Sequence, residues 1–256
     1  MAGVRNGGNR SSSMARFDMT APLLHGRASH LLKGTPLTPS KPIRRIQENV
    51  LAVHERRLLN WICPRLPAWT KPDHLTLLAL VGALIVFAGY AASMLNANWL
   101  WASVAGYFIH WFGDSLDGSL ARFRSIERPR YGYFVDHSAD ALGTLFIVGG
   151  IGVSPYVRLD VSLIALAGYY LLSIHAFLAA RVIDELKLSY VAAGPTELRL
   201  ILIALTLSMY VFGQSGPVLM SLSRYDLFAG AVGLLLIVLF VVQTLATARR
   251  LSRLGE

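Results

Sequence analysis

Residues 110–143 read HWFGDSLDGSLARFRSIERPRYGYFVDHSADALG, which is two apolar stretches joined by a short basic segment. Within the apolar stretches stand four acids: Asp114, Asp117, Asp136 and Asp140. An unpaired acid at the centre of a membrane helix costs roughly 2.5–3.5 kcal/mol on insertion. Four such acids would threaten the fold unless cations compensated them. The stretch therefore indicates a pair of membrane helices that carry a cation site.

The spacing of these acids places them in two pairs. Asp114 and Asp117 are three residues apart, so they project from one face of a helix. Asp136 and Asp140 are four residues apart and share a face in the same way. The segment 123–131 is short enough to make the two helices antiparallel neighbours, so the acidic faces can converge. Clustered carboxylates suit Mg²⁺ or Mn²⁺, and two such ions are the usual device for polarising a phosphoryl group.

The composition of the chain agrees with a membrane protein. Of 256 residues, 54% are hydrophobic and 15% are charged, whereas soluble proteins average about 25% charged. The mean hydropathy is +0.49. Cations that flank membrane spans explain the formal charge of +9 better than nucleic-acid binding does, so we expect no nucleic-acid partner. The single cysteine, Cys63, cannot form an intrachain disulfide.

Six apolar segments are long enough to cross a bilayer. They lie at 73–95, 98–121, 132–153, 159–182, 196–213 and 225–247. Asp73 after Pro72 and Thr196 after Pro195 are typical of helix starts. We therefore predict an all-α fold, a polytopic membrane protein with six transmembrane helices.

The residues before and after these segments differ in character. Residues 1–45 are rich in Gly, Ser, Arg and Pro, which predicts a disordered basic arm. Residues 46–72 are predicted to form a juxtamembrane amphipathic surface helix and its connector, although a helix packed on the protein would show the same period. The apolar residues at helical spacing are Ile46, Val50, Val53, Leu58 and Trp61. The six-helix catalytic domain then spans 73–248, and 249–256 is predicted to be a basic cytoplasmic tail.

The positive charges predict the orientation of the spans. With six spans both termini share a side, and the segments on that side hold 22 of the 24 Lys and Arg residues. The opposite connections hold Arg158 and Arg224. The positive-inside rule then puts both termini and the aspartate site in the cytoplasm. The compact length is typical of a bacterial inner-membrane protein.

Eight residues of the central stretch form one pattern. It reads Asp114-x2-Asp117-Gly118-x2-Ala121-Arg122-x9-Gly132-x3-Asp136-x3-Asp140. The pattern resembles the signature of the CDP-alcohol phosphotransferases, integral membrane enzymes of phospholipid synthesis. All eight positions match, and the spacer of nine residues is one longer than the family's commonest form. The six-span layout, with the motif running from the second span into the third, is also similar to the family.

The resemblance implies a role for each of these positions. Asp114, Asp117 and Asp136 would hold Mg²⁺ or Mn²⁺, with two ions expected. Asp140 would stand beside the metals as the catalytic base or as an activator of the acceptor hydroxyl. The CDP-donor site would combine the first two aspartates with four further residues: Gly118, Ala121, Arg122 and Gly132. The resemblance also implies a homodimer embedded in membrane lipids.

A second polar group is predicted at the cytoplasmic depth of the aspartates. It consists of Arg181, Glu197 and Arg199. The family resemblance implies that basic residues here bind phosphorylated polar acceptors. Glu197 after Thr196, together with the Asp136–His137 pair, instead resembles the choline/ethanolamine branch of the family. A structural ion pair between Arg181 and Glu197 at a helix end is the alternative to an acceptor site.

These observations favour a transferase that releases CMP from a CDP-linked donor. The favoured donor is CDP-diacylglycerol, with a polar acceptor such as inositol, inositol phosphate, glycerol phosphate or serine. One alternative is transfer of a CDP-choline or CDP-ethanolamine headgroup to diacylglycerol or a related lipid alcohol. Another, from a different class, is a transporter whose aspartates bind cations. A transporter would not require Gly118, Ala121, Arg122 and Gly132 in this register. A non-catalytic membrane anchor would leave the aspartates unexplained.

Overall fold

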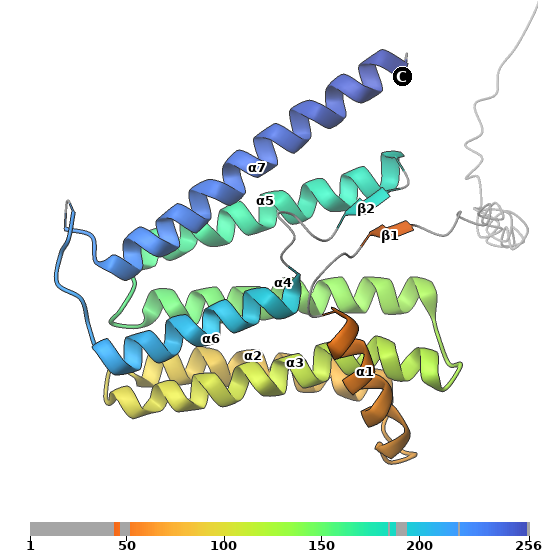
Figure 1. Cartoon of the computed structure of the whole chain (residues 1–256), viewed down its shortest axis with the longest axis horizontal. Coiled ribbons are helices and arrows are strands. Elements are labelled where there is room, and N and C mark those ends of the chain that lie inside the picture. The colour runs from red at the N-terminus through yellow and green to blue at the C-terminus, as the bar shows by residue number, and fades with distance from the viewer. Residues whose placement is uncertain (1–43, 47–51, 184, 188–193, 220, 255–256) are drawn as a thin grey trace, which may run out of the picture. The chain divides into compact units, whose positions relative to one another are not determined.

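The computed structural model describes residues 44–46, 52–183, 185–187, 194–219 and 221–254. Helices make up most of this part of the chain (Figure 1). The α-helices are α1 (Ala52–Ile62), α2 (Pro72–Ala92), α3 (Leu100–Phe123), α4 (Pro129–Val153), α5 (Leu159–Ile183), α6 (Pro195–Phe212) and α7 (Arg224–Leu254). Two 3₁₀ turns, η1 (Cys63–Arg65) and η2 (Ala97–Trp99), precede α2 and α3.

The six long helices α2 to α7 run side by side and alternate in direction (Figure 1). Helix α3 packs on α2 and α6, α4 packs on α2 and α5, and α7 packs on α5. Helix α1 lies against α3, beside the end of the bundle where α3 ends and α4 begins. The connections at this end are the basic ones, so the helix order matches the alternation of charge along the sequence.

Helices α2 and α3 approach closely because glycines face each other. A Cβ on Gly106 would lie 2.8 Å from the carbonyl oxygen of Gly82. A Cβ on Gly113 would lie 2.5 Å from the backbone nitrogen of Ala79. Since such distances exclude a side chain, these positions require glycine for helix packing. The aspartates of α3 are thereby held at a fixed depth relative to α2.

Buried hydroxyls tie three of the helices together. Tyr90 on α2 lies 2.6 Å from Thr206 of α6 and 3.3 Å from Tyr107 of α3, measured between side-chain oxygens. All three side chains are fully buried. Because each hydroxyl has a partner, the polar cluster stabilises this packing rather than weakening it.

The six predicted apolar segments correspond to α2 to α7, and their ends agree within about three residues except at the end of α7, which continues to Leu254. Among the described helices, four are long and apolar enough to cross a membrane: α2, α5, α6 and α7. Helices α3 and α4 have 24 and 25 residues and are also long enough, but the acids and cations near the end of α3 and the start of α4 lower their hydropathy. Helices α2 and α6 begin at Pro72 and Pro195, one residue before the predicted starts at Asp73 and Thr196.

The segment before α2 contains a helix and a short strand. Within the range 46–72 predicted for a helix and its connector, α1 spans Ala52–Ile62, and prolines at 64 and 67 follow in the connector. Arg44–Ile46 forms β1, a short strand that pairs in parallel with β2 (Glu185–Lys187). Residues 47–51 and nearly all of the predicted basic arm lie outside the described residues. At the other end, α7 continues to Leu254, so most of the predicted tail extends that helix.

Helix α1 has two apolar faces. Leu59 and Cys63 are buried in a cluster with residues of α2 and α3. Val53, Leu58 and Trp61 are exposed. The helix is therefore packed on the protein through one face, and on the other its apolar side chains are exposed in the part of the chain that the structure describes.

Candidate functional site

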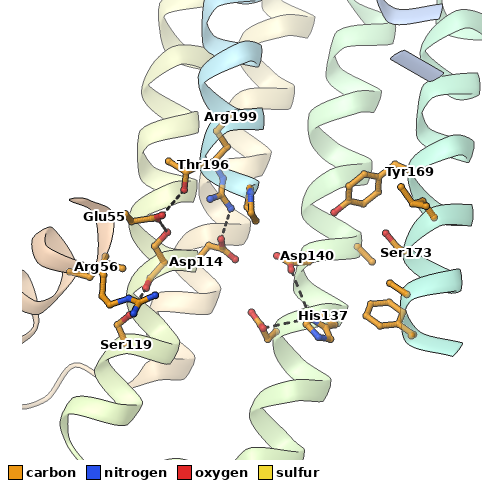
Figure 2. A pocket seen from close by; sticks show the side chains of 18 of the residues that line it. Glu55, Arg56, Asp114, Ser119, His137, Asp140, Tyr169, Ser173, Thr196 and Arg199 are labelled. Atoms are coloured by element: carbon orange, nitrogen blue, oxygen red, sulfur yellow. Dashed lines mark hydrogen bonds and ion pairs between the residues drawn. The ribbon is translucent and has the colours of Figure 1, made fainter. Parts of the chain in front are cut away.

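A pocket with a volume of about 1140 Å³ lies at the basic end of the bundle, and two sets of residues face each other across it (Figure 2). The first set, here the α3 wall, comes from α1, α3 and α6. It consists of Glu55, Asp114, Ser115, Ser119, Thr196 and Arg199. The second set, the α4 wall, comes from α4 and α5. It consists of Asp136, His137, Asp140, Tyr169, Ser173 and Phe177.

The α3 wall contains an ion pair between two helices. Arg199 of α6 donates from its guanidinium Nη2 to Oδ2 of Asp114 on α3. The two side chains are 11% and 19% exposed. Partial burial strengthens such a charge-assisted pair relative to a surface one. The contact fixes α6 against the first aspartate of the predicted motif.

Glu55 brings α1 into the same wall. Its Oε1 accepts hydrogen bonds from Trp111 Nε1 at 2.9 Å and from Ser115 Oγ at 2.8 Å, both on α3. Its Oε2 accepts from Thr196 Oγ1 of α6 at 2.8 Å. One carboxylate thus joins three helices at the edge of the pocket (Figure 2).

The α4 wall surrounds its acids with rings. His137 Nδ1 lies 3.6 Å from Asp136 Oδ2 and 4.0 Å from Asp140 Oδ2. The imidazole ring centroid is 4.3 Å from the ring of Tyr133 and 5.0 Å from that of Phe177 on α5. These rings orient His137 toward the carboxylates, so the histidine and the two aspartates form one cluster.

The aspartates of both walls converge. Asp114 and Asp140 point toward each other from α3 and α4 (Figure 2). On the α4 wall, ligand atoms of Asp136, His137 and Asp140 lie within 4.8 Å of one another, close enough to share one metal ion. Carboxylate oxygens of this kind fit Mg²⁺ or Mn²⁺. The predicted antiparallel pair of acidic helices is therefore present, and its residues fit a divalent cation.

Asp117 is oriented differently from the other three acids. It is buried, and its Oδ2 accepts a hydrogen bond from Thr76 Oγ1 of α2 at 2.7 Å. Its Oδ1 accepts from the backbone nitrogen of Gly118 at 2.5 Å. Among the described residues Asp117 lies outside the pocket lining. The structure thus brings Asp114, Asp136 and Asp140 together and directs Asp117 toward α2.

The predicted donor residues lie around the end of α3 and the start of α4. Arg122 lines the pocket and donates to Ser119 Oγ at 3.2 Å. A Cβ on Gly118 would first meet the tip of the Arg122 side chain at 3.3 Å, and one on Gly132 would meet no described atom within 4 Å. Unlike Gly113, neither position needs glycine for helix packing. Gly118, Gly132 and the half-buried Ala121 lie outside the lining among the described residues.

The three predicted acceptor residues separate. Arg199 lines the pocket, where it pairs with Asp114. Arg181 is exposed at the end of α5, and it lies outside the lining of this pocket in the described chain. Glu197 Oε2 accepts a hydrogen bond from the backbone nitrogen of Gly194 at 3.0 Å, so this acid caps the start of α6. Among the three predicted acceptor residues, Arg199 is therefore the one that lines this pocket in the described chain, and the acceptor role itself stays a prediction.

Several pocket residues have no counterpart in the sequence prediction. Glu55 and Arg56 come from α1, and Tyr169 and Ser173 come from α5. The charges of α1 alternate with apolar residues as on any surface helix, so the sequence offers no signal for Glu55. Its partners are 56, 60 and 141 residues away in the chain. Only the packed fold brings them together.

Comparison with known proteins gives consistent matches. The sequence model described as CDP-alcohol phosphatidyltransferase matches residues 69–242 of the chain. The chain is 28% identical over 122 residues to cholinephosphotransferase 1 of Danio rerio, which covers 42% of this chain and 32% of that protein. It is 30% identical over 130 residues to the Gallus gallus protein of the same name, covering 45% and 38%. The chain thus spans about a third of the length of these relatives.

Proposed function

The chain belongs to the CDP-alcohol phosphatidyltransferase family, and on this basis we propose that its pocket transfers a phospho-alcohol headgroup from a CDP-linked donor to a lipid alcohol. The family match confirms the resemblance drawn from the eight-residue pattern. The observation that carries the proposal is the convergence of Asp114 and Asp140 from two helices on one pocket, with Asp136 beside them. Such a carboxylate cluster suits metal-assisted phosphoryl transfer.

The proposed donor is CDP-choline or CDP-ethanolamine, and the proposed acceptor is diacylglycerol or a related lipid alcohol. The relatives named cholinephosphotransferase 1 support this branch. The Asp136–His137 pair supports it too, because His137 lies within the acidic cluster of the α4 wall. The sequence taken alone favours CDP-diacylglycerol as the donor. The comparisons instead favour the other donor class considered there, CDP-choline or CDP-ethanolamine.

In the proposed reaction each acid has a task. Asp114, Asp117 and Asp136 would hold the divalent ions, with Asp140 adjoining them. Bound Mg²⁺ or Mn²⁺ would supply charge neutralisation for the diphosphate and the departing CMP. The acceptor hydroxyl attacks the phosphorus distal to cytidine, its proton passes to the Asp140 carboxylate, and the bond from that phosphorus to the CMP oxygen breaks. For Asp117 this role requires a turn of the side chain away from Thr76.

Four residues are proposed to receive the CDP portion of the donor together with the first two aspartates. They are Gly118, Ala121, Arg122 and Gly132. Arg122 lines the pocket with a cation suited to phosphate oxygens. The space around Gly132, which no described side chain fills, supports the same assignment.

A second candidate is transfer of a phosphatidyl group from CDP-diacylglycerol to a polar acceptor such as inositol phosphate or glycerol phosphate. Arg199 favours it, because a guanidinium in the pocket could bind an anionic acceptor. The pairing of Arg199 with Asp114 and the exposed position of Arg181 weaken this candidate.

We also propose that all six long helices cross a bacterial inner membrane and that the pocket opens to the cytoplasm. The 24 residues of α3 extend about 36 Å, more than the hydrocarbon thickness of about 30 Å. Its acids lie near one end and face protein, which lowers the cost of insertion. A homodimer belongs to the proposal through the family resemblance.

Labelling of one introduced cysteine at a time tests this orientation. A membrane-impermeant maleimide should label Gly216→Cys on intact cells and Glu127→Cys only after the membrane is opened. The native Cys63 should add little background, because it is 1% exposed and burial raises the pKa of its thiol. The reverse labelling pattern would contradict the charge argument.

The test of the proposed function is a panel of donors and acceptors incubated with the purified full chain and Mg²⁺. CMP release would be measured, and the lipid product identified by mass spectrometry. We expect CMP and a phospholipid from CDP-choline or CDP-ethanolamine with diacylglycerol. Product from CDP-diacylglycerol and a polar acceptor would instead establish the second candidate. Absence of CMP release from every donor would overturn the proposal.

A further inference from the structure

Glu55 lies outside the part of the chain that carries the family pattern, yet it contacts the residues around the site. The family match begins at residue 69, whereas Glu55 is on α1. Its carboxylate accepts hydrogen bonds from Trp111, Ser115 and Thr196, so both of its oxygens are in use. Bonds between two side chains make up only about 10–15% of protein hydrogen bonds, and Glu55 accepts three of them.

Two of these partners adjoin the ion pair of the α3 wall. Ser115 follows Asp114 in α3, and Thr196 lies one turn before Arg199 in α6. A single acceptor that binds both hydroxyls fixes the distance between these two helix segments. Asp114 and Arg199 are therefore held together by their own contact and by Glu55 beside it.

Helix α1 is itself held firmly on the bundle. Leu59 and Cys63 pack into the apolar cluster between α1, α2 and α3. The connector that follows is bound by Arg124, whose guanidinium donates to the carbonyl oxygens of Leu66 at 3.1 Å and Pro67 at 2.9 Å. Glu55 thus projects from a fixed support, which is what a positioning contact needs.

We propose that Glu55 is a positioning residue of the transferase, which makes α1 a structural part of the active site. Its carboxylate sets the α3 wall through Ser115 and Thr196 and touches no reacting atom. The expected effect of Glu55 on turnover rests on the proposed function. The expected effect of Glu55 on the distance between α1 and α6 does not. The same contacts should hold α1 close to α6 whatever the substrate is.

Two substitutions separate positioning from simple loss of folding. Glu55→Ala removes all three hydrogen bonds and should lower kcat about tenfold or more, with the donor KM changed less than about threefold. Glu55→Gln keeps an acceptor for Trp111 and Ser115 and can donate to Thr196, so it should retain kcat within about threefold. The matched control is Glu127→Ala, an exposed acid outside the pocket lining, which should leave both constants unchanged.

A double-mutant cycle tests the route through α6. Thr196→Val should lower kcat in the wild-type background and add little to Glu55→Ala, because both remove the same contact. Additive losses would contradict the proposed coupling. So would a Glu55→Gln variant as slow as Glu55→Ala, or a Glu55→Ala variant whose folded fraction turns over normally.

The effect of Glu55 on the distance between α1 and α6 can be measured without an activity assay. Nitroxide labels at Arg57→Cys on α1 and Leu200→Cys on α6 would be placed in the full chain, and their distance distribution measured by pulsed EPR. We expect Glu55→Ala to broaden that distribution and Glu55→Gln to leave it narrow. An unchanged distribution in Glu55→Ala would overturn the inference. If the wild type released no CMP from any donor, the proposed function would fail while this measurement still judged Glu55.

Discussion

The two walls of the pocket hold their acids by different means. On the α4 wall, the cluster of Asp136, His137 and Asp140 comes from little more than one helical turn. On the α3 wall, Asp114 is set by Arg199 of α6 and by a hydrogen-bond network that reaches α1. The α4 cluster needs only its own helix and the rings packed beside it. The α3 wall needs three helices to be correctly assembled, so we expect it to be the more sensitive to distant changes.

The largest expected effect is loss of an acid from either wall. Asp114→Asn on the α3 wall and Asp136→Asn or Asp140→Asn on the α4 wall should each lower CMP release by about a thousandfold or more. An amide can neither balance a divalent ion nor accept the proton. Size-exclusion chromatography of the purified variants should show wild-type behaviour. If a variant kept more than a tenth of wild-type activity, the substituted acid would not be part of the catalytic site.

Removal of divalent ions by a chelator tests the metal dependence of both walls at once. Because the clustered carboxylates fit Mg²⁺ or Mn²⁺, EDTA should abolish CMP release, and added Mg²⁺ or Mn²⁺ should restore it. Activity would be assayed after dialysis against EDTA, with wild-type protein dialysed without it as the control. Full turnover in excess chelator would contradict a metal role for these aspartates.

Substitutions of Arg199 and Arg181, which the sequence predicts in one acceptor site, should differ in their effect on activity. Arg199→Gln removes the partner of Asp114 from the α3 wall and should lower kcat/KM by tenfold to a hundredfold, typical of a lost charge-assisted hydrogen bond. Arg181→Gln changes an exposed side chain outside the lining and should stay within twofold. Equal losses of kcat/KM in both variants would indicate that Arg181 and Arg199 act together in one acceptor site.

The two walls also differ in how far the sequence predicts them. Local periodicity is enough to place Asp136 and Asp140 on one face of a helix, and the structure has them there. The same reasoning does not predict the orientation of Asp117, whose carboxylate accepts a hydrogen bond from Thr76 on α2. The spacing of residues within one helix does not predict which side chains a neighbouring helix brings into contact with them. The eight-residue pattern thus identifies the family but not the orientation of each acid.

The helices themselves were largely predictable, and the contacts at their ends were not. Apolar length and the Pro72 and Pro195 starts locate α2 to α7. The β1–β2 pairing and the network of Glu55 join segments more than 50 residues apart, and no local pattern encodes them. Apolar length locates α3 and α4 as well, even though their acids lower the hydropathy of both helices.

The smallest expected effects distinguish the glycines. Gly132→Ala should preserve stability or raise it by up to about 1 kcal/mol, because alanine favours helix and no described atom lies in its way. The donor KM should nevertheless rise several-fold if CDP occupies that space. Gly113→Ala should instead destabilise the fold by about 1–3 kcal/mol, since its Cβ would overlap the α2 backbone.

Thermal unfolding and donor titrations of the two glycine variants provide the check. A Gly132→Ala variant with normal donor KM would exclude this glycine from the donor site. A Gly113→Ala variant as stable as wild type would contradict the close α2–α3 approach.

Binding of Mn²⁺ to the full chain, followed by EPR, tests most directly whether the two walls act as one site. We expect Asp114→Asn on the α3 wall and Asp136→Asn on the α4 wall each to weaken Mn²⁺ binding at least about tenfold, because ligands from both helices are needed. Glu127→Asn serves as the exposed-acid control and should bind as wild type does. If Asp114→Asn bound Mn²⁺ as tightly as wild type while Asp136→Asn did not, the α4 cluster alone would form the metal site, and the central claim would be wrong.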